Sequence, residues 1–361
     1  MKLRSPFKII DWYIIKKFLG SYFFSIILIL AITVVFDTNE KLDAFMKAPL
    51  RAIVFDYFAN FLPYFANLFS PLFVFIAVIF FTSKMAGNSE IIAILSSGMS
   101  FKRLFIPYMF SAAVIASLNI VLSCYIIPPS NITRIEFTNT YVRNKRVDYG
   151  SNIQFKVEPK VIAYIARYDN SNKMGYRFSL EEFEGKTLKS RLTAQTITYD
   201  SAYQWHVNNY VIRNLDGMRE TITKGSRMDT TINVTPSDFL ISPTDCETMT
   251  SPQLKEYIAR QRERGVGNIK SFEIEYHKRY AMIGAAFILT AIGMSLASRK
   301  TKGGMGINIG LGLLLSFSYI FFSTITSTFA VSGATSPFIA MWIPNIMYTI
   351  IAIILYRTAP K

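Results

Sequence analysis

One uncharged stretch limits the folds open to this chain more than any other feature. From Gly303 to Tyr356 the sequence contains no Asp, Glu, Lys or Arg. An apolar helix needs about 20 residues to cross a hydrocarbon core, so this stretch is too long for one crossing and must fold back. Small, polar and turn-forming residues from Val331 to Pro337 mark the reversal. The stretch therefore predicts two membrane-spanning helices joined by a short turn.

Four further uncharged runs are long enough to span a membrane. They are Phe18–Phe36, Tyr57–Ser83, Leu104–Ile127 and Tyr280–Ser298. Hydrophobic residues make up 51% of the chain although 17% of residues are charged, so the charges must be segregated from the spans. The sequence therefore predicts an integral membrane protein with six transmembrane helices.

Basic residues indicate which helix ends face the cytoplasm. Lys and Arg concentrate before the first span, between the second and third, after the fourth and after the sixth. Cytoplasmic loops carry such an excess, so we expect both termini in the cytoplasm and the segment after the third span in the periplasm. These clusters carry most of the net charge of +15. Nucleic acid is not an expected partner, because the soluble part has no basic stripe with interleaved aromatics.

The hydrophobic period changes to two beyond the third span. Ile153–Glu158 alternates apolar and polar residues as a half-buried strand does. Further strands, separated by turn residues, are expected at Val161–Tyr168, Tyr176–Phe183, Leu188–Tyr199, Gln204–Arg213, Arg219–Thr223 and Met228–Val234. This spacing is typical of an antiparallel sandwich, jelly roll or open barrel. Its interior is either a filled core or an apolar slot for a lipid chain.

The chain divides into three parts on this basis. Residues 1–127 hold spans one to three, residues 128–270 hold the β-rich domain with flanking helices, and residues 271–361 hold spans four to six. Ser251 and Pro252 predict the start of a helix that leads back toward the fourth span.

Motifs of catalysis are missing from the sequence. The two His and two Cys residues have no partners at metal-ligand spacing, and no nucleophile elbow, zinc-protease or phosphate-binding motif occurs. We therefore expect no metal, no cofactor and no enzymatic activity in this chain. If its action needs ATP, another subunit must bind it.

The loop between the second and third spans predicts a short cytoplasmic helix. Asn88 or Ser89 is a suitable N-cap, Glu90 suits the first turn, and Gly98 can end the helix. Apolar residues are expected on its exposed side, namely Ile91, Ile94 and Leu95. Such a helix can lie on lipid or dock into a groove of another protein, and the residues alone leave both roles open.

Several short motifs occur in a specific order along the chain. They are Asp11-Trp12-Tyr13-Ile14, Ser89-Glu90, Ser97-Gly98, Thr235-Pro236, and Met249-Thr250-Ser251 ahead of Leu254. Their order resembles the LptF/LptG permease family, the transmembrane part of the lipopolysaccharide-export ABC transporter. The likeness covers nearly the whole chain. It implies a membrane α + β fold, with a periplasmic β-jelly-roll domain inserted between the third and fourth transmembrane helices.

The resemblance also implies a function. The chain would be a permease subunit that extracts lipopolysaccharide from the inner membrane and passes it to a periplasmic protein bridge. Its implied partners are a second LptF/LptG-type permease chain, an LptB-type ATPase dimer that hydrolyses the ATP, and an LptC/LptA-type bridge. Both the F-type and the G-type chain fit the sequence.

Two groups of site residues follow from the resemblance. The segment 88–98 would be the coupling helix in the ATPase groove, with Glu90 at the family's acidic coupling position. The ATPase-coupling residues would be Glu90, Ile91, Ile94, Leu95 and Gly98. Lys41, Lys47 and Arg51 are candidates for contact with the lipid headgroup, or else ordinary flanking charges. Val34, Val35 and Phe36 stand where family members often carry a lysine, which leaves the partner subunit as an alternative headgroup site.

Two rival functions come from other classes. One is a membrane-anchored periplasmic binding or assembly scaffold without transport activity, and the other is an intramembrane enzyme. Intramembrane ionisable groups usually mark function, and the spans contain no carboxylate or His pairs, which disfavours the enzyme. An ATPase that co-purifies in mild detergent would separate a transporter from a scaffold.

Overall fold

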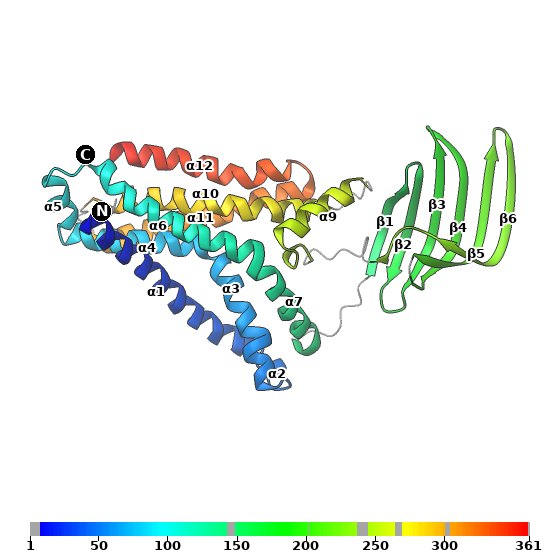
Figure 1. Cartoon of the computed structure of the whole chain (residues 1–361), viewed down its shortest axis with the longest axis horizontal. Coiled ribbons are helices and arrows are strands. Elements are labelled where there is room, and N and C mark those ends of the chain that lie inside the picture. The colour runs from blue at the N-terminus through cyan, green and yellow to red at the C-terminus, as the bar shows by residue number, and fades with distance from the viewer. Residues whose placement is uncertain are drawn as a thin grey trace, which may run out of the picture. The chain divides into compact units, whose positions relative to one another are not determined.

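A computed structural model describes residues 8–142, 149–201, 203–236, 245–263, 269–299 and 304–359. The chain forms two compact units. A helical unit comprises residues up to 142, 247–251 and from 273 onward, and a second unit comprises 143–246 and 252–272. Among these residues, six helices are long and apolar enough to cross a membrane, and a six-stranded antiparallel sheet lies between the third and fourth of them in the chain (Figure 1). The predicted fold class is confirmed.

The described part of the helical unit consists of long apolar helices joined by short elements, and three of its segments are π-helical. In chain order the elements are α1 (Ile9–Glu40), α2 (Leu42–Phe45), η1 (Ala52–Phe58), α3 (Ala59–Leu68), α4 (Ser70–Gly87), α5 (Glu90–Ser96), α6 (Phe101–Val121), η2 (Leu122–Ile126), α7 (Ile127–Phe137), η3 (Thr138–Val142), α10 (Lys270–Ala297), α11 (Gly304–Ser332) and α12 (Pro337–Thr358). The turn between α11 and α12 falls at the predicted reversal, and Gly333 has a φ of 87° there.

The most enclosed span of the helical unit is α4. In the 18 residues of α4, 78% are buried, whereas only 17% are buried in the apolar 18-residue stretches of α1 and of α11. One apolar cluster joins α4 to α1, α5 and α6, and a second joins it to α10, α11 and α12. Figure 1 shows α1 diverging from the other spans. Each of α1 and α11 therefore keeps an apolar face that the described part of this chain does not cover.

The second predicted span is two helices, interrupted at Phe69. Ser70 and Pro71 open α4, and the proline ring prevents the regular hydrogen bond to the preceding turn. The Ser70 hydroxyl lies 2.9 Å from the Tyr22 hydroxyl and accepts a hydrogen bond from Asn119 Nδ2 at 2.6 Å. Side-chain hydrogen bonds of this kind tie neighbouring helices together inside a membrane.

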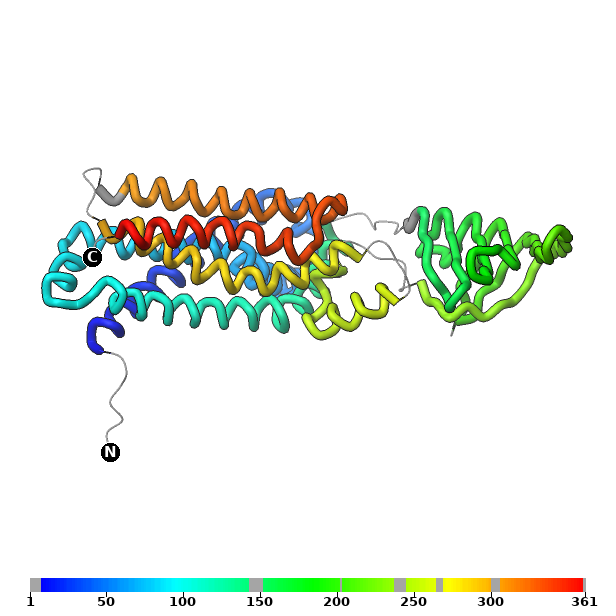
Figure 2. The backbone as a smooth tube through the Cα atoms, turned by 90° about the horizontal axis from the view of Figure 1, so that it is seen from above, coloured from blue at the N-terminus to red at the C-terminus, as the bar shows by residue number. Residues whose placement is uncertain are grey.

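The second unit contains one antiparallel sheet whose strands follow sequence order. They are β1 (Tyr149–Glu158), β2 (Val161–Asp169), β3 (Met174–Glu184), β4 (Thr187–Tyr199), β5 (Gln204–Asp216) and β6 (Arg219–Thr231). Figure 2 shows that the sheet is curved, which is compatible with the predicted jelly roll. The unit also contains most of α9 (Ser251–Glu263), and α9 begins at the predicted residue.

The prediction of seven strands is wrong at one place. The last two predicted strands form the single strand β6, which pairs with β5 on both sides of Gly225. A Cβ on Gly225 would lie 2.5 Å from the ring of Tyr210, its partner on β5. The glycine is therefore needed for the close approach of an aromatic ring, and the chain does not turn there.

Side chains fill the interior of the sheet around Trp205. The indole is 2% exposed and donates from Nε1 to the carbonyl oxygen of Val234 at 3.0 Å. The rings of Tyr168 and Tyr199 pack edge-on against it. This part of the sheet has the filled core that was one of the two predicted alternatives.

Candidate functional site

The segment 88–98, which we call the elbow, contains α5. It lies at the end of the helical unit where α1 begins and α12 ends (Figure 1). Ser89 precedes the helix with a φ of 61° and makes no side-chain capping hydrogen bond, so the expected N-cap bond is absent. Gly98 has a φ of 87°, and its N–H donates to the Leu95 carbonyl at 3.1 Å. This left-handed glycine ends the helix as predicted.

The apolar stripe of α5 packs on its own chain. Ile91 is 1% exposed and belongs to the cluster formed with α1, α4 and α6, and Ile94 and Leu95 are partly buried against that cluster. The expectation that Ile91 lies on the exposed side is wrong, because residues at i, i+3 and i+4 form the face that a short helix turns toward its own core. The residue missed by that reasoning is Ile92, which is 54% exposed.

Glu90 connects the elbow to α1. The Tyr13 hydroxyl donates to Glu90 Oε2 at 2.9 Å, and Asn88 Nδ2 donates to Glu90 Oε1 at 3.2 Å. Both carboxylate oxygens thus have partners, and one partner belongs to another helix. A subunit that binds Glu90 would therefore act on α1 as well as on α5.

A buried ion pair joins the two helices beside the elbow. Asp11, in the first turn of α1, is 1% exposed and accepts hydrogen bonds from Arg103 Nη1 at 3.0 Å and Nη2 at 2.5 Å. Its carboxylate also accepts from the backbone N–H of Lys8 at 2.7 Å. Arg103 lies in the first turn of α6, so this bidentate ion pair fixes the start of α1 against the start of α6.

Sequence reasoning did not find this ion pair. It used Asp11 and Tyr13 only for a family resemblance and Arg103 only as a flanking basic charge. A signal was available, because an acidic residue in the first turn of an apolar helix needs a partner once it is buried. The identity of the partner, 92 residues away, could not be read from the sequence.

The three headgroup candidates differ in their surroundings. Lys41 forms an ion pair with Asp37, donates to the Tyr57 hydroxyl at 2.6 Å, and lies 5.2 Å from the centre of the Tyr57 ring. Its charge is thus engaged within the chain. Lys47 and Arg51 are exposed, and we find no ion pair for either among the described residues. The structure therefore separates one structural cation from two accessible ones.

The whole arrangement can be compared with known proteins. A family model described as lipopolysaccharide export system permease LptF/LptG matches residues 12–358. No curated protein matches the chain. The matched region runs from the first turns of α1 to the end of α12, so it includes the elbow, the six spans and the sheet.

Proposed function

Because the chain belongs to the LptF/LptG family of lipopolysaccharide export permeases, we propose that it is the permease subunit of an ABC transporter whose elbow is driven by a separate ATPase subunit. Family membership makes the chain a multi-pass inner-membrane protein that works within the Lpt complex. The proposal adds the coupling residues, the orientation, and the way in which each partner contacts this chain.

The bracing of the elbow supports the coupling role. Ile91 anchors α5 in the core, the Tyr13 hydroxyl holds Glu90, and the Asp11–Arg103 pair holds α1 against α6. A force on α5 would therefore move the starts of α1 and α6 together with the end of α4. We propose that an LptB-type ATPase dimer accepts the exposed side of α5, with Ile92 at its centre and Ile94 and Leu95 at its border. Glu90 and Gly98 fix the two ends of this contact.

The uncovered helices support pairing with a second permease chain. α1 and α11 each keep an uncovered apolar face, and in the described part of the chain no other element comes within 4 Å of a Cβ placed on Gly306 or Gly310 of α11. Glycines four residues apart let another helix approach closely. We propose that a second LptF/LptG-type chain packs near these faces. The cavity between the two chains would admit lipopolysaccharide sideways, with Lys47 and Arg51 available to its phosphates.

The sheet supports the transfer step. β1 and β6 each pair with one neighbour in the described sheet, so each leaves a row of backbone groups for an added strand. We propose that one of these edges meets an LptC/LptA-type bridge protein in the periplasm. Exposing an acyl chain to water costs about 0.8 kcal/mol per CH₂ group, so a lipid with several chains needs both ATP and a continuous apolar path. In this orientation the elbow and both termini lie in the cytoplasm.

Co-purification tests the proposal directly. The wild-type chain in mild detergent should retain an ATPase in stoichiometric amount, and Glu90→Arg should abolish both this retention and lipid export while the chain still inserts. Glu136→Arg, a charge reversal at an exposed position on α7, is the matched control and should change neither. Lipid export that survives Glu90→Arg would contradict the coupling role. A wild-type chain that retains no ATPase would instead favour the scaffold without transport activity.

A further inference from the structure

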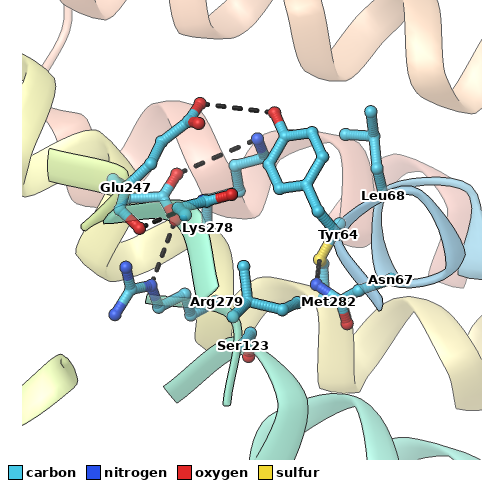
Figure 3. Close-up of a pocket in the computed structure, with 11 residues that line it drawn as sticks. Tyr64, Asn67, Leu68, Ser123, Glu247, Lys278, Arg279 and Met282 are labelled. Carbon is cyan, nitrogen blue, oxygen red and sulfur yellow. Dashed lines mark hydrogen bonds and ion pairs between the residues drawn. The ribbon is translucent and has the colours of Figure 1, made fainter. Parts of the chain in front are cut away.

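The chain returns briefly to the helical unit between two parts of the second unit. Residues 143–246 and 252–272 belong to the second unit, whereas residues 247–251 between them belong to the helical unit. We call 247–251 the anchored segment. Its first residue, Glu247, lines a polar pocket together with residues of α3, of η2–α7 and of α10 (Figure 3). Side chains of α3, α7 and α10 contact the segment, so it attaches the chain of the second unit to three helices.

Arg279 on α10 holds the end of the anchored segment. Its side chain is 3% exposed and donates from Nη1 to the Met249 carbonyl oxygen at 3.0 Å and to the Ser251 hydroxyl at 3.1 Å. Its Nε donates to Glu275, one turn earlier on α10, at 3.0 Å. A buried charge is tolerated when it is paired and hydrogen-bonded, and both conditions hold here. Because Ser251 is also the first residue of α9, the arginine joins α10 to the start of that helix.

Two other helices hold the beginning of the anchored segment. Asn131 on α7 is 0% exposed and donates from Nδ2 to the Glu247 carbonyl oxygen at 3.2 Å. The Tyr64 hydroxyl on α3 donates to the Glu247 carboxylate at 3.4 Å, and Figure 3 shows this hydroxyl pointing toward Glu247. Arg134 Nη2 lies 3.9 Å from the same carboxylate. The segment is therefore held at points that do not lie along a single helix.

The second unit is also connected to the spans through α10 itself. This helix is continuous from Lys270 to Ala297, and the boundary between the units falls between Phe272 and Glu273. A helix that leaves its neighbours can bend at that place, so it does not by itself fix the orientation of the unit beyond it. A second attachment, made to other helices, restricts that bending. The anchored segment supplies such an attachment.

We propose that the anchored segment sets the orientation of the second unit relative to the spans, with Arg279 as the positioning residue. This inference rests on the proposed function, because a fixed orientation lets a lipid that leaves the spans meet the sheet. An apolar side chain can pack a segment as stably as a buried ion pair does. The guanidinium adds direction, because its planar fork bonds Glu275 and the segment in one geometry.

Distances between spin labels test the proposal. The buried free cysteines Cys124 and Cys246 are replaced by alanine, and the full chain, with the subunits that it retains, is placed in lipid nanodiscs. The inter-unit pair carries labels at Glu136 on α7 and at Lys186 in the turn between β3 and β4. The intra-unit pair carries labels at Glu136 and at Ala334, and all three labelled positions are exposed. The wild-type chain should give a narrow distance distribution for both pairs.

Releasing the anchored segment should broaden the inter-unit distribution alone. Arg279→Gln removes the attachment to α10, and Asn131→Leu removes the attachment to α7. A flexible tether of the length of the segment spreads over about 12 Å, so each variant should widen the inter-unit distribution by about 5 Å or more. The intra-unit distribution should keep its width. Lys278→Gln removes the neighbouring cation of α10, which is 39% exposed, and as the matched control it should keep the wild-type width of both pairs.

The readouts separate this proposal from the proposed ATPase coupling. ATPase retention, measured on the same preparations, should be unchanged in Arg279→Gln, because this residue does not belong to the elbow. A wild-type chain without ATPase would contradict the coupling, while the label distances would still decide the orientation.

Two results would overturn the proposal. One is a folded Arg279→Gln or Asn131→Leu chain that keeps the wild-type inter-unit width. A variant that widens both pairs has lost its fold, and the other variant then decides. The second result is that both variants widen both pairs, because these contacts would then hold the helical unit itself together and would not position the second unit.

Discussion

The Asp11–Arg103 pair offers a quantitative test of how the elbow is held. Asp11 accepts three hydrogen bonds, two of them from Arg103. A hydrogen bond to a charged group contributes about 1.5–3 kcal/mol, but Arg103 is 28% exposed, so water replaces part of what is lost. We therefore expect Asp11→Asn to lower the free energy of unfolding by about 2 kcal/mol, between the values typical of exposed and of buried pairs.

A double-mutant cycle isolates the contact itself. The purified full chain, Asp11→Asn, Arg103→Gln and the double variant are unfolded by SDS titration in mixed micelles. Because each single variant already breaks the bidentate ion pair, the coupling energy between the two sites should be about 1–2 kcal/mol. Lys102→Gln, at the neighbouring exposed cation, should change stability by no more than about 0.5 kcal/mol.

The cycle also has a functional readout. Releasing the start of α1 from α6 should weaken the contact between Tyr13 and Glu90, so both single variants should retain less ATPase than Lys102→Gln does. A coupling energy below about 0.3 kcal/mol, within the range of independent sites, would refute the reasoning that this pair braces the elbow.

Three further outcomes are expected. Ile92→Asp should reduce ATPase retention in a pull-down about tenfold or more, because it places a charge in an apolar contact, whereas Ile92→Val should leave retention unchanged. Equal retention by the two variants would favour a helix that lies on lipid. Trp205→Phe leaves the Val234 carbonyl without its donor, so hydrogen exchange of β5 amides should become about tenfold faster, and unchanged exchange would contradict this role. Burial raises the pKa of Glu247 in the folded chain. The protonated Glu247 therefore contributes fully to the free energy of unfolding below the unfolded-state pKa, and this contribution is lost as pH rises through the raised folded-state pKa. Glu247→Gln should therefore flatten the fall in melting temperature over that pH interval, and an unaltered profile would speak against it.

The membrane spans were predictable because a span is indicated by the hydrophobicity of a whole run of residues and not by any single residue. A long run without charges remains a span whatever its individual side chains contact, so errors at single residues do not accumulate. The interruption at Phe69 is different. Two prolines in the predicted second span indicate a bend, but its exact place depends on Ser70 finding Tyr22 and Asn119 on other helices.

The elbow shows the limit of local patterns at a site. Its end at Gly98 follows from capping chemistry, whereas the N-cap hydrogen bond predicted for its start is absent. The exposed side of α5 does not follow from the sequence, because an apolar stripe fits an intramolecular core as well as it fits a partner. In the structure Ile91 is buried and Ile92 is exposed. Gly225 is a similar case in the sheet. A glycine next to a lysine is typical of a turn, but here the glycine leaves room for the ring of Tyr210, its partner on the neighbouring strand, and this contact cannot be read from the local sequence.

The accessible side of α5 is central to the account, and photo-crosslinking tests it most directly. A photoreactive amino acid at Ile92, which is 54% exposed, is activated in intact membranes, and Tyr203, which is 43% exposed in the sheet unit, serves as the matched position. The account predicts an adduct with the ATPase subunit from position 92 and none from position 203. An ATPase adduct from position 203, or only lipid adducts from position 92, would contradict it.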